Sequence, residues 1–241
     1  MIRAVTFDLW QTLITEKPEE EERRRSLRYE RMLALFNELG KPSTLGALEE
    51  AYRACGEWLQ EVWKENKDVS TRDQVDFVLR RLDKDLRLSQ TDGERLEEAY
   101  VSPIRDIPPV ALPGAREALR TLSQAGVCLG LVCNTGRTPG RVLRPLLEGM
   151  GLRAYFKAMA FSDELRVRKP DERIFMKVLA DLQTSPEQAV HVGDIAETDV
   201  AGAKRAGLLA LHLVRDGSKP SPEADGVLRS AAEVPDWIAN R

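Results

Sequence analysis

The chain has 241 residues, of which 31% are charged and 42% hydrophobic, and its formal net charge is −3. This composition is that of a globular protein with one large domain, or a core that carries one insertion. The slight acidic excess argues against nucleic acid or an anionic membrane as a partner, and no apolar run approaches the roughly 20 residues of a membrane span. With only two histidines, a His-rich zinc site is disfavoured.

The N-terminal segment predicts a buried strand over residues 2–8, which ends in the acid Asp8. It has none of the charged and apolar regions of a signal peptide. Three cysteines, an odd number without metal-ligand spacing, favour reduced thiols. We therefore expect a cytoplasmic protein.

From residue 17 to residue 105 the strand signals give way to helical ones. Apolar residues at helical spacing predict helices over 18–39, from 45 onward, from 71 onward and over 89–100. Thr71 with Gln74 fits a capping box at the start of the third helix, and Ser89 with Asp92 marks the start of the fourth. The pattern predicts a helical domain at 17–105, inserted into a core made of residues 1–16 and 106–241.

After the two prolines at 108–109, helices and strands alternate. We expect helices over 114–124, 138–151, 171–182 and 198–206, and strands over 127–133, 158–161, 189–192 and 208–214. A polar loop at 216–225 and a final strand or turn with a short helix at 227–238 complete the chain. Such alternation predicts an α/β, Rossmann-like fold, a parallel sheet with helices on both faces. The carboxyl ends of its strands form the edge where these folds bind ligands.

Chemically capable residues follow four of these strands. Asp8 ends the first strand, Asn134 follows the second, Lys169 lies in the loop after the third, and Asp194 with Asp199 follows the fourth. Several carboxylates at one edge repel one another unless a cation lies between them, and sites rich in carboxylate oxygens suit Mg²⁺. A lysine offsets the remaining negative charge, amide donors from Asn134 and the following backbone hold phosphoryl oxygens, and a carboxylate is an accepted covalent nucleophile. The set favours phosphoryl chemistry on a small anionic substrate.

These segments resemble the four motifs of the haloacid dehalogenase-like hydrolase superfamily. The first is Asp-x-Asp-x-Thr, which reads Asp-Leu-Trp-Gln-Thr at residues 8–12, and the second is the hydrophobic strand that ends in Cys-Asn-Thr at 133–135. The third is Lys-Pro at 169–170, and the fourth is Gly-Asp at 193–194 with a further acid at Asp199. The fourth match is the most specific, and the resemblance covers nearly the whole chain.

The resemblance implies a role for each matching residue. Asp8 is the nucleophile and Lys169 orients it with the phosphate. Mg²⁺ is held by Asp8, the backbone carbonyl of Trp10 and Asp194, with Asp199 in support. The substrate-binding residues it implies are Trp10, Thr12, Cys133, Asn134 and Thr135. The helices at 17–105 resemble the family's helical cap, which closes over the active site.

Two positions depart from the family pattern. Trp10 replaces the second acid, which in family phosphatases protonates the leaving oxygen and activates water, help worth about 10²–10⁴-fold. Trp10 is interpreted as both a hydrophobic plug beneath the cap and a platform for the substrate. Cys133 replaces the usual hydroxyl and is expected to be a small buried strand residue.

Three functions remain open from the sequence. The leading one is Mg²⁺-dependent hydrolysis of a phosphate ester or acyl phosphate through an aspartyl-phosphate. The second is dehalogenation of a 2-haloacid by Asp8, supported by Trp10 because a halide leaves without a proton, and opposed by the fourth motif. The third is a binding protein whose activity has decayed.

Three arginines at 23–25 are expected to form a solvated helix face. The less favoured interpretation is that one of them binds an anionic substrate. His191 is expected in the core or behind the site, and His212 is expected to be structural.

Overall fold

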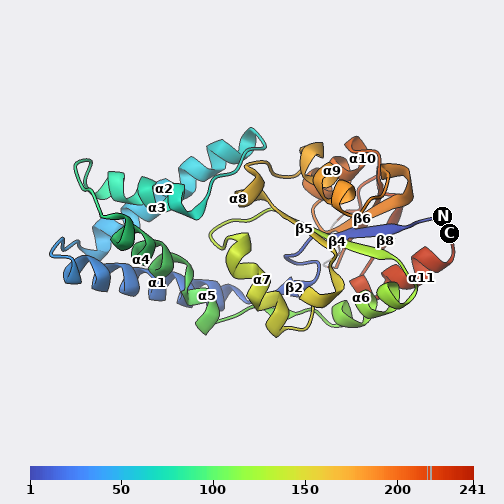
Figure 1. Ribbon diagram of the computed structural model, residues 1–241, viewed down its shortest axis with the longest axis horizontal. Helices are drawn as coiled ribbons and strands as arrows, with labels where there is room; N and C mark the ends of the chain where they lie inside the picture. Colours follow the sequence, from blue (N-terminus) through green and yellow to red (C-terminus); the bar gives the residue numbers. More distant parts are fainter. Residues whose placement is uncertain (216, 218) are drawn as a thin grey trace.

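A six-stranded parallel sheet forms the centre of the molecule (Figure 1). The computed structural model describes residues 1–215, 217 and 219–241. The strand order is β5-β4-β1-β6-β7-β8, and every neighbouring pair is parallel. The strands are β1 (Ala4–Phe7), β4 (Cys128–Cys133), β5 (Ala158–Phe161), β6 (Ala189–Gly193), β7 (Leu209–Leu213) and β8 (Gly226–Leu228). The expected Rossmann-like sheet is confirmed, and β1 lies between β4 and β6, where the strand order reverses and such folds bind ligands.

Helices cover both faces of this sheet. α6 (Ala115–Gln124), α7 (Gly140–Gly149) and α11 (Val234–Ala239) pack on one face, while α9 (Glu172–Asp181) and α10 (Ala201–Arg205) pack on the other. Successive residues of a strand point to opposite faces, so Leu131 belongs to the first apolar cluster and its neighbour Val132 to the second. The shorter elements are η1 (Arg153–Tyr155), α8 (Ser162–Leu165), η2 (Pro186–Gln188), η3 (Ala196–Val200) and η4 (Ala231–Glu233).

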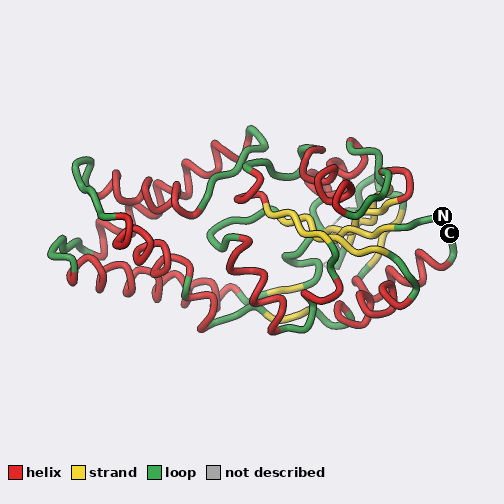
Figure 2. The backbone as a smooth tube through the Cα atoms, viewed as in Figure 1, coloured by secondary structure: helices red, strands yellow, loops and turns green. Residues whose placement is uncertain are grey.

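The inserted helices form a block of their own, at the end of the molecule away from the chain termini (Figures 1 and 2). They are α1 (Pro18–Glu38), α2 (Leu45–Lys64), α3 (Thr71–Leu82), α4 (Gln90–Val101) and α5 (Pro103–Asp106). Their apolar faces meet in a separate cluster that includes Met32, Leu48, Val78 and Leu96. A short antiparallel pair, β2 (Ile14–Thr15) with β3 (Val110–Ala111), joins the two segments through which the chain enters and leaves the block.

Three local expectations need adjustment. The capping box of α3 consists of Ser70 and Asp73, one residue earlier than predicted, because Ser70 has the extended backbone of a cap and Thr71 is already helical. The helix expected from Thr138 begins only at Gly140, after an extended Pro139. The helix expected over 198–206 opens instead with the wide turn η3. In the predicted loop 216–225, residues 216 and 218 lie outside the described residues.

Candidate active site

Asp8 lies at the centre of the sheet's carboxyl edge, directly after β1. Its backbone N–H donates to the carbonyl of Val192 on β6 at 2.9 Å, which fixes the residue at this edge. Lys169 reaches the same point from the loop after β5, and its Nζ lies 2.5 Å from Asp8 Oδ1 and 2.6 Å from Asp199 Oδ1. All three side chains are buried, so one ammonium group links two carboxylates away from bulk solvent.

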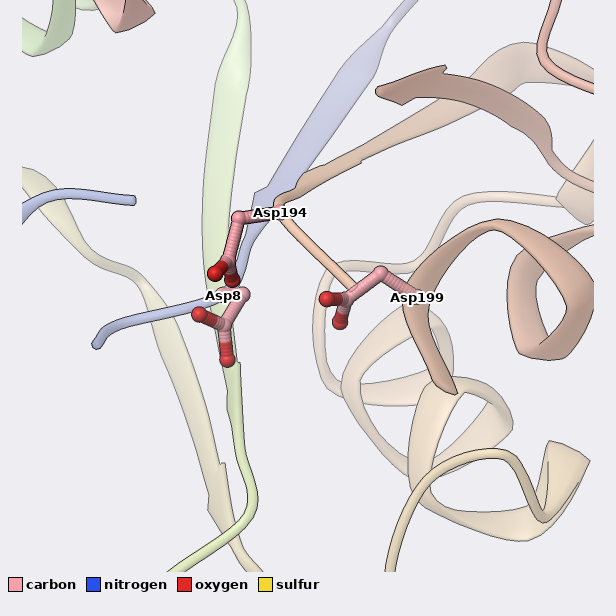
Figure 3. Close-up of side chains that lie close together, drawn as sticks. All are labelled: Asp8, Asp194 and Asp199. Carbon is pink, nitrogen blue, oxygen red and sulfur yellow. The ribbon is translucent and has the colours of Figure 1, made fainter. Parts of the chain in front are cut away.

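Asp194 and Asp199 complete an acidic cluster with Asp8 (Figure 3). One oxygen of each carboxylate lies within 4.8 Å of the others. Asp194 follows the end of β6, whereas Asp199 comes from η3, and its Oδ2 accepts the N–H of Ile195 at 2.9 Å. A Cβ at Gly193 would lie 2.2 Å from Cγ of Asp199, so only glycine at this position permits the close approach of Asp199.

The charges of this cluster perturb one another strongly. Burial, together with the negative charges of Asp8 and Asp199, raises the pKa of Asp194 to about 7. Burial also raises the pKa of Asp8, although Lys169 opposes the shift. For Asp199, the lysine and the hydrogen bond with His191 outweigh burial and lower the pKa. The cluster therefore carries more negative charge than Lys169 alone compensates.

His191 lies behind the cluster, as expected. Its Nε2 is 3.1 Å from Asp199 Oδ1, and its Nδ1 is 2.9 Å from the hydroxyl of Thr6. Since a carboxylate only accepts hydrogen bonds, Nε2 carries the proton. His212 donates from Nε2 to the carbonyl of Asp194 at 3.1 Å and accepts from Ser221 N–H, which is a structural role.

The residues after β4 hold the loops of the site together. The Asn134 amide makes two hydrogen bonds with the backbone of Lys169, donating to its carbonyl at 3.0 Å and accepting its N–H at 2.7 Å. Thr135 is buried and its N–H donates to Ser162 Oγ at 2.7 Å. Cys133 is fully buried, as expected, and burial raises the pKa of its thiol well above the ordinary value. Direct contact of these residues with a substrate stays a prediction.

Trp10 and Thr12 lie in the turn that follows Asp8. Trp10 is half-buried and packs against the apolar clusters of both the sheet and the helical block. It therefore sits where the two parts meet. Thr12 is 1% exposed, and its hydroxyl finds no hydrogen-bond partner among the described residues. Because buried hydroxyls are normally hydrogen-bonded, one without a partner among the described residues is a candidate for contact with a ligand.

A cavity of about 290 Å³ opens between the sheet edge and the helical block. Trp10, Asn134 and Thr135 line it from the core. The residues that the sequence left unassigned line the rest, among them Arg28, Tyr52, Ile104, Arg137 and Arg168. Arg24, from the run expected to be a solvated face, also lines it and is buried in an ion pair with Glu16. For that one arginine the expectation is wrong, whereas Arg23 is exposed.

Asp68, which the sequence did not single out, reaches from the helical block into the core. Its carboxylate accepts from the hydroxyls of Ser162 and Thr135 and pairs with Arg168 at 3.2 Å. Beside it, the backbone of Asn66 accepts the N–H of Arg168 at 3.0 Å. The helical block thus contacts the loop that directly precedes Lys169. Only the position of Asp68 after α2 could have hinted at this role.

Comparison with known proteins identifies the family. The model of haloacid dehalogenase-like hydrolases matches residues 2–207. A glyceraldehyde 3-phosphate phosphatase of Methanopyrus kandleri is 31% identical over all of this chain and 94% of its own length. A HAD phosphatase structure from Thermococcus onnurineus is 26% identical, with a TM-score of 0.64 over 98% of both chains. A 2-haloacid dehalogenase structure from Pseudomonas syringae has a TM-score of 0.75 over 100% and 99% of the two chains, but at 22% identity it shows the fold alone.

The fold and the buried carboxylate–lysine cluster define an α/β hydrolytic enzyme. The family match over most of the chain shows that it belongs to the haloacid dehalogenase-like hydrolases. In the part of the chain that the structure describes, no helix combines the length and the apolar character that crossing a bilayer requires.

Proposed function

We propose that this enzyme is a Mg²⁺-dependent phosphatase that acts on a small phosphorylated substrate through Asp8. The observation that carries the proposal is Asp194, whose carboxylate adjoins Asp8 and Asp199 at the sheet edge. A third acid there adds to the repulsion unless a cation binds, and it has no use in attack on a carbon–halogen bond. The 31% identity to a protein named glyceraldehyde 3-phosphate phosphatase supports the same choice.

The donor set fits the metal. Oxygens from three carboxylates lie within 4.8 Å of one another, and oxygen-rich sites of this kind suit Mg²⁺. The raised pKa of Asp194 shows that its ionised form lacks a compensating charge. We propose Asp8, Asp194 and the backbone carbonyl of Trp10 as ligands, with Asp199 in support. When bound, Mg²⁺ neutralises charge on the phosphoryl oxygens and aligns that group with the nucleophile.

Each residue of the site has a separate role in the proposed reaction. Asp8 attacks phosphorus with one carboxylate oxygen, the bond to the leaving oxygen breaks, and an aspartyl-phosphate forms that water then hydrolyses. Lys169 favours the ionised form of Asp8 and offsets the charge of the phosphoryl group. Asn134 holds the backbone of that lysine in place. Thr12, four residues after Asp8, offers a buried hydroxyl that has no hydrogen-bond partner among the described residues.

We also propose that residues 17–105 act as a cap domain over the core. The block has its own apolar cluster, is joined to the core through β2 and β3, and contributes one wall of the cavity. Closure of such a domain excludes water from the reaction and sets the shape of the pocket.

Dehalogenation is the second candidate, and Trp10 is the observation that favours it. No acid stands at that position, and a halide leaves without needing a proton. One experiment separates the candidates: the purified enzyme is assayed with an aryl phosphate and with a 2-haloacid, each with Mg²⁺ and with EDTA. We expect phosphate release that EDTA abolishes. Halide release that EDTA does not change would refute the phosphatase proposal, and no turnover of either would favour a binding role.

A further inference from the structure

Two arginines in the wall of the cavity have no acidic partner in the part of the chain that the structure describes. Arg28 comes from α1 and is 6% exposed, and Arg137 comes from the loop between β4 and α7. Among the described residues, neither lies within 4.0 Å of a carboxylate oxygen, whereas two other arginines of this cavity are paired, Arg24 with Glu16 and Arg168 with Asp68. Arg28 and Arg137 therefore leave positive charge uncompensated at one wall.

Two tyrosines hold these guanidinium groups in place. Nε of Arg28 donates to the carbonyl of Tyr100 at 2.6 Å, and Nη1 donates to the hydroxyl of Tyr52 at 2.7 Å. The Arg137 guanidinium lies 3.9 Å from the centre of the Tyr52 ring and donates to the Tyr100 hydroxyl at 2.5 Å. The two cations are thus fixed against aromatic faces before any ligand arrives, which lowers the cost of ordering them.

Donors remain available on both arginines. Within the described residues, Nη2 of Arg28 and Nε of Arg137 take part in no hydrogen bond. The same cavity extends to Trp10, two residues after Asp8, and to Asn134, which bonds to the backbone of Lys169. The acid Glu21 also lines it, but that side chain is exposed and forms no ion pair with either arginine. A ligand that enters the cavity therefore meets the turn that follows Asp8 on one side and, on another, two guanidinium groups without a carboxylate partner among the described residues.

We infer that Arg28 and Arg137 form a subsite for a second anionic group of the substrate, which makes the substrate a small phosphorylated acid. The inference rests on the proposed phosphatase function and deepens it. The anionic group is a carboxylate or a second phosphate, because planar guanidinium groups bind both through paired charge-assisted hydrogen bonds. The cavity, with a volume of about 290 Å³, suits a small substrate.

Equilibrium binding of non-hydrolysable phosphonates tests the subsite without any turnover. With Mg²⁺ in excess, calorimetry compares ω-phosphonocarboxylates and alkane bisphosphonates, each with a two-, three- or four-atom chain, against alkylphosphonates of equal length. We expect at least one acidic compound to bind the wild type about tenfold to a hundredfold more tightly than its neutral-ended partner, the gain typical of hydrogen bonds between charged groups. The better of the two acidic series identifies the group.

Variants assign this selectivity to the two arginines. Arg28→Gln and Arg137→Gln should each lower the ratio of the two affinities by about tenfold, while Arg53→Gln, an exposed arginine of α2 outside the cavity, should leave it unchanged. Arg28→Lys and Arg137→Lys keep the positive charge and replace any glutamine variant that fails to fold. Because lysine lacks the planar pair of donors of a guanidinium group, these variants should still lower the ratio of the two affinities. A wild type without selectivity at millimolar concentrations, or selectivity that survives the substitutions, would overturn the inference. Failure of the phosphatase proposal is seen separately, as absence of phosphate release.

Discussion

Buried charge is handled in opposite ways at the sheet edge, called here the core wall, and at the arginine side of the neighbouring cavity, called here the helical wall. At the sheet edge, Lys169 lies between the carboxylates of Asp8 and Asp199, and the excess charge there is negative. At the helical wall, Arg28 and Arg137 lie against tyrosines, with no carboxylate partner among the described residues, and the excess charge is positive. The negative wall is suited to a metal ion and a phosphoryl group, and the positive wall to an acidic group. Under the proposed function, chemistry belongs to the sheet edge, and recognition of a second anionic group belongs to the helical wall, to which the core contributes Arg137.

The largest effect is expected from the core wall. Asp8→Asn keeps the size of the side chain but removes the nucleophile, so the rate of phosphate release should fall by at least about 10³-fold. The fold should persist, because an amide can still accept the hydrogen bond from Lys169. The measurement is steady-state turnover of an aryl phosphate, with circular dichroism to verify folding. Retained activity in a folded Asp8→Asn protein would contradict the assignment of the nucleophile.

Trp10 lies where the two walls meet, and replacing it sharpens the division of roles. We expect the wild type to cleave aryl and acyl phosphates far better than alkyl phosphates, because no acid at position 10 protonates an alkoxide. Trp10→Asp should raise alkyl-phosphate turnover by at most about 10²–10⁴-fold, the range of general-acid catalysis. The gain is smaller if loss of the indole leaves a void.

Trp10→Asn is the matched control, since it removes the indole without adding an acid. Single-turnover rates on an aryl and an alkyl phosphate measure the chemical step. Similar wild-type rates on both substrates would show that another residue supplies the proton.

The sequence predicted which residues meet at the core wall far better than it predicted those of the helical wall. Parallel strands end at one edge, so Asp8, Lys169, Asp194 and Asp199 had to meet once the alternation of strands and helices was recognised. Whether these residues carry the proposed roles stays a prediction.

The helical wall was not foretold because its residues come from separate helices and one loop. Their meeting depends on the angles at which α1, α2 and α4 pack, and apolar spacing does not specify those angles. Arg24 and Arg28 are one turn apart on α1 and therefore share a face, yet the sequence alone does not show that this face is buried. Asp68 likewise lies in a connection whose path the pattern does not determine.

Breaking the charge balance of the core wall should be costly for stability. Lys169→Met leaves Asp8 and Asp199 buried without their cation, which should lower the free energy of unfolding by about 3–5 kcal/mol. The control is Lys177→Met, which removes an exposed pair with Asp181 and should cost at most about 1 kcal/mol. Urea denaturation in EDTA measures both. Equal losses would show that the buried network contributes no more than a surface pair.

The smallest expected effect concerns Asp194 in the absence of metal. Its pKa is raised to about 7, so between pH 4 and 7 the folded state retains a proton that the unfolded chain releases, and its contribution to stability falls as pH rises through that window. At pH 8 the ionised Asp194 destabilises the folded state by the full amount. Asp194→Asn should therefore stabilise the protein in EDTA, by about 1–2 kcal/mol after allowance for the exposed part of the side chain.

Magnesium should make the wild type more stable than Asp194→Asn. At a hundredfold excess over the dissociation constant, binding to the folded state adds about 2.7 kcal/mol to the wild type, whereas Asp194→Asn has lost a ligand and should respond little. Thermal melts at pH 8, with EDTA and with millimolar Mg²⁺, measure both effects. Because one substitution is expected to raise stability without metal and to remove the gain with metal, a general weakening of the fold cannot imitate the result. A wild-type melt that Mg²⁺ leaves unmoved would remove the metal site and, with halide release, make dehalogenation the better account.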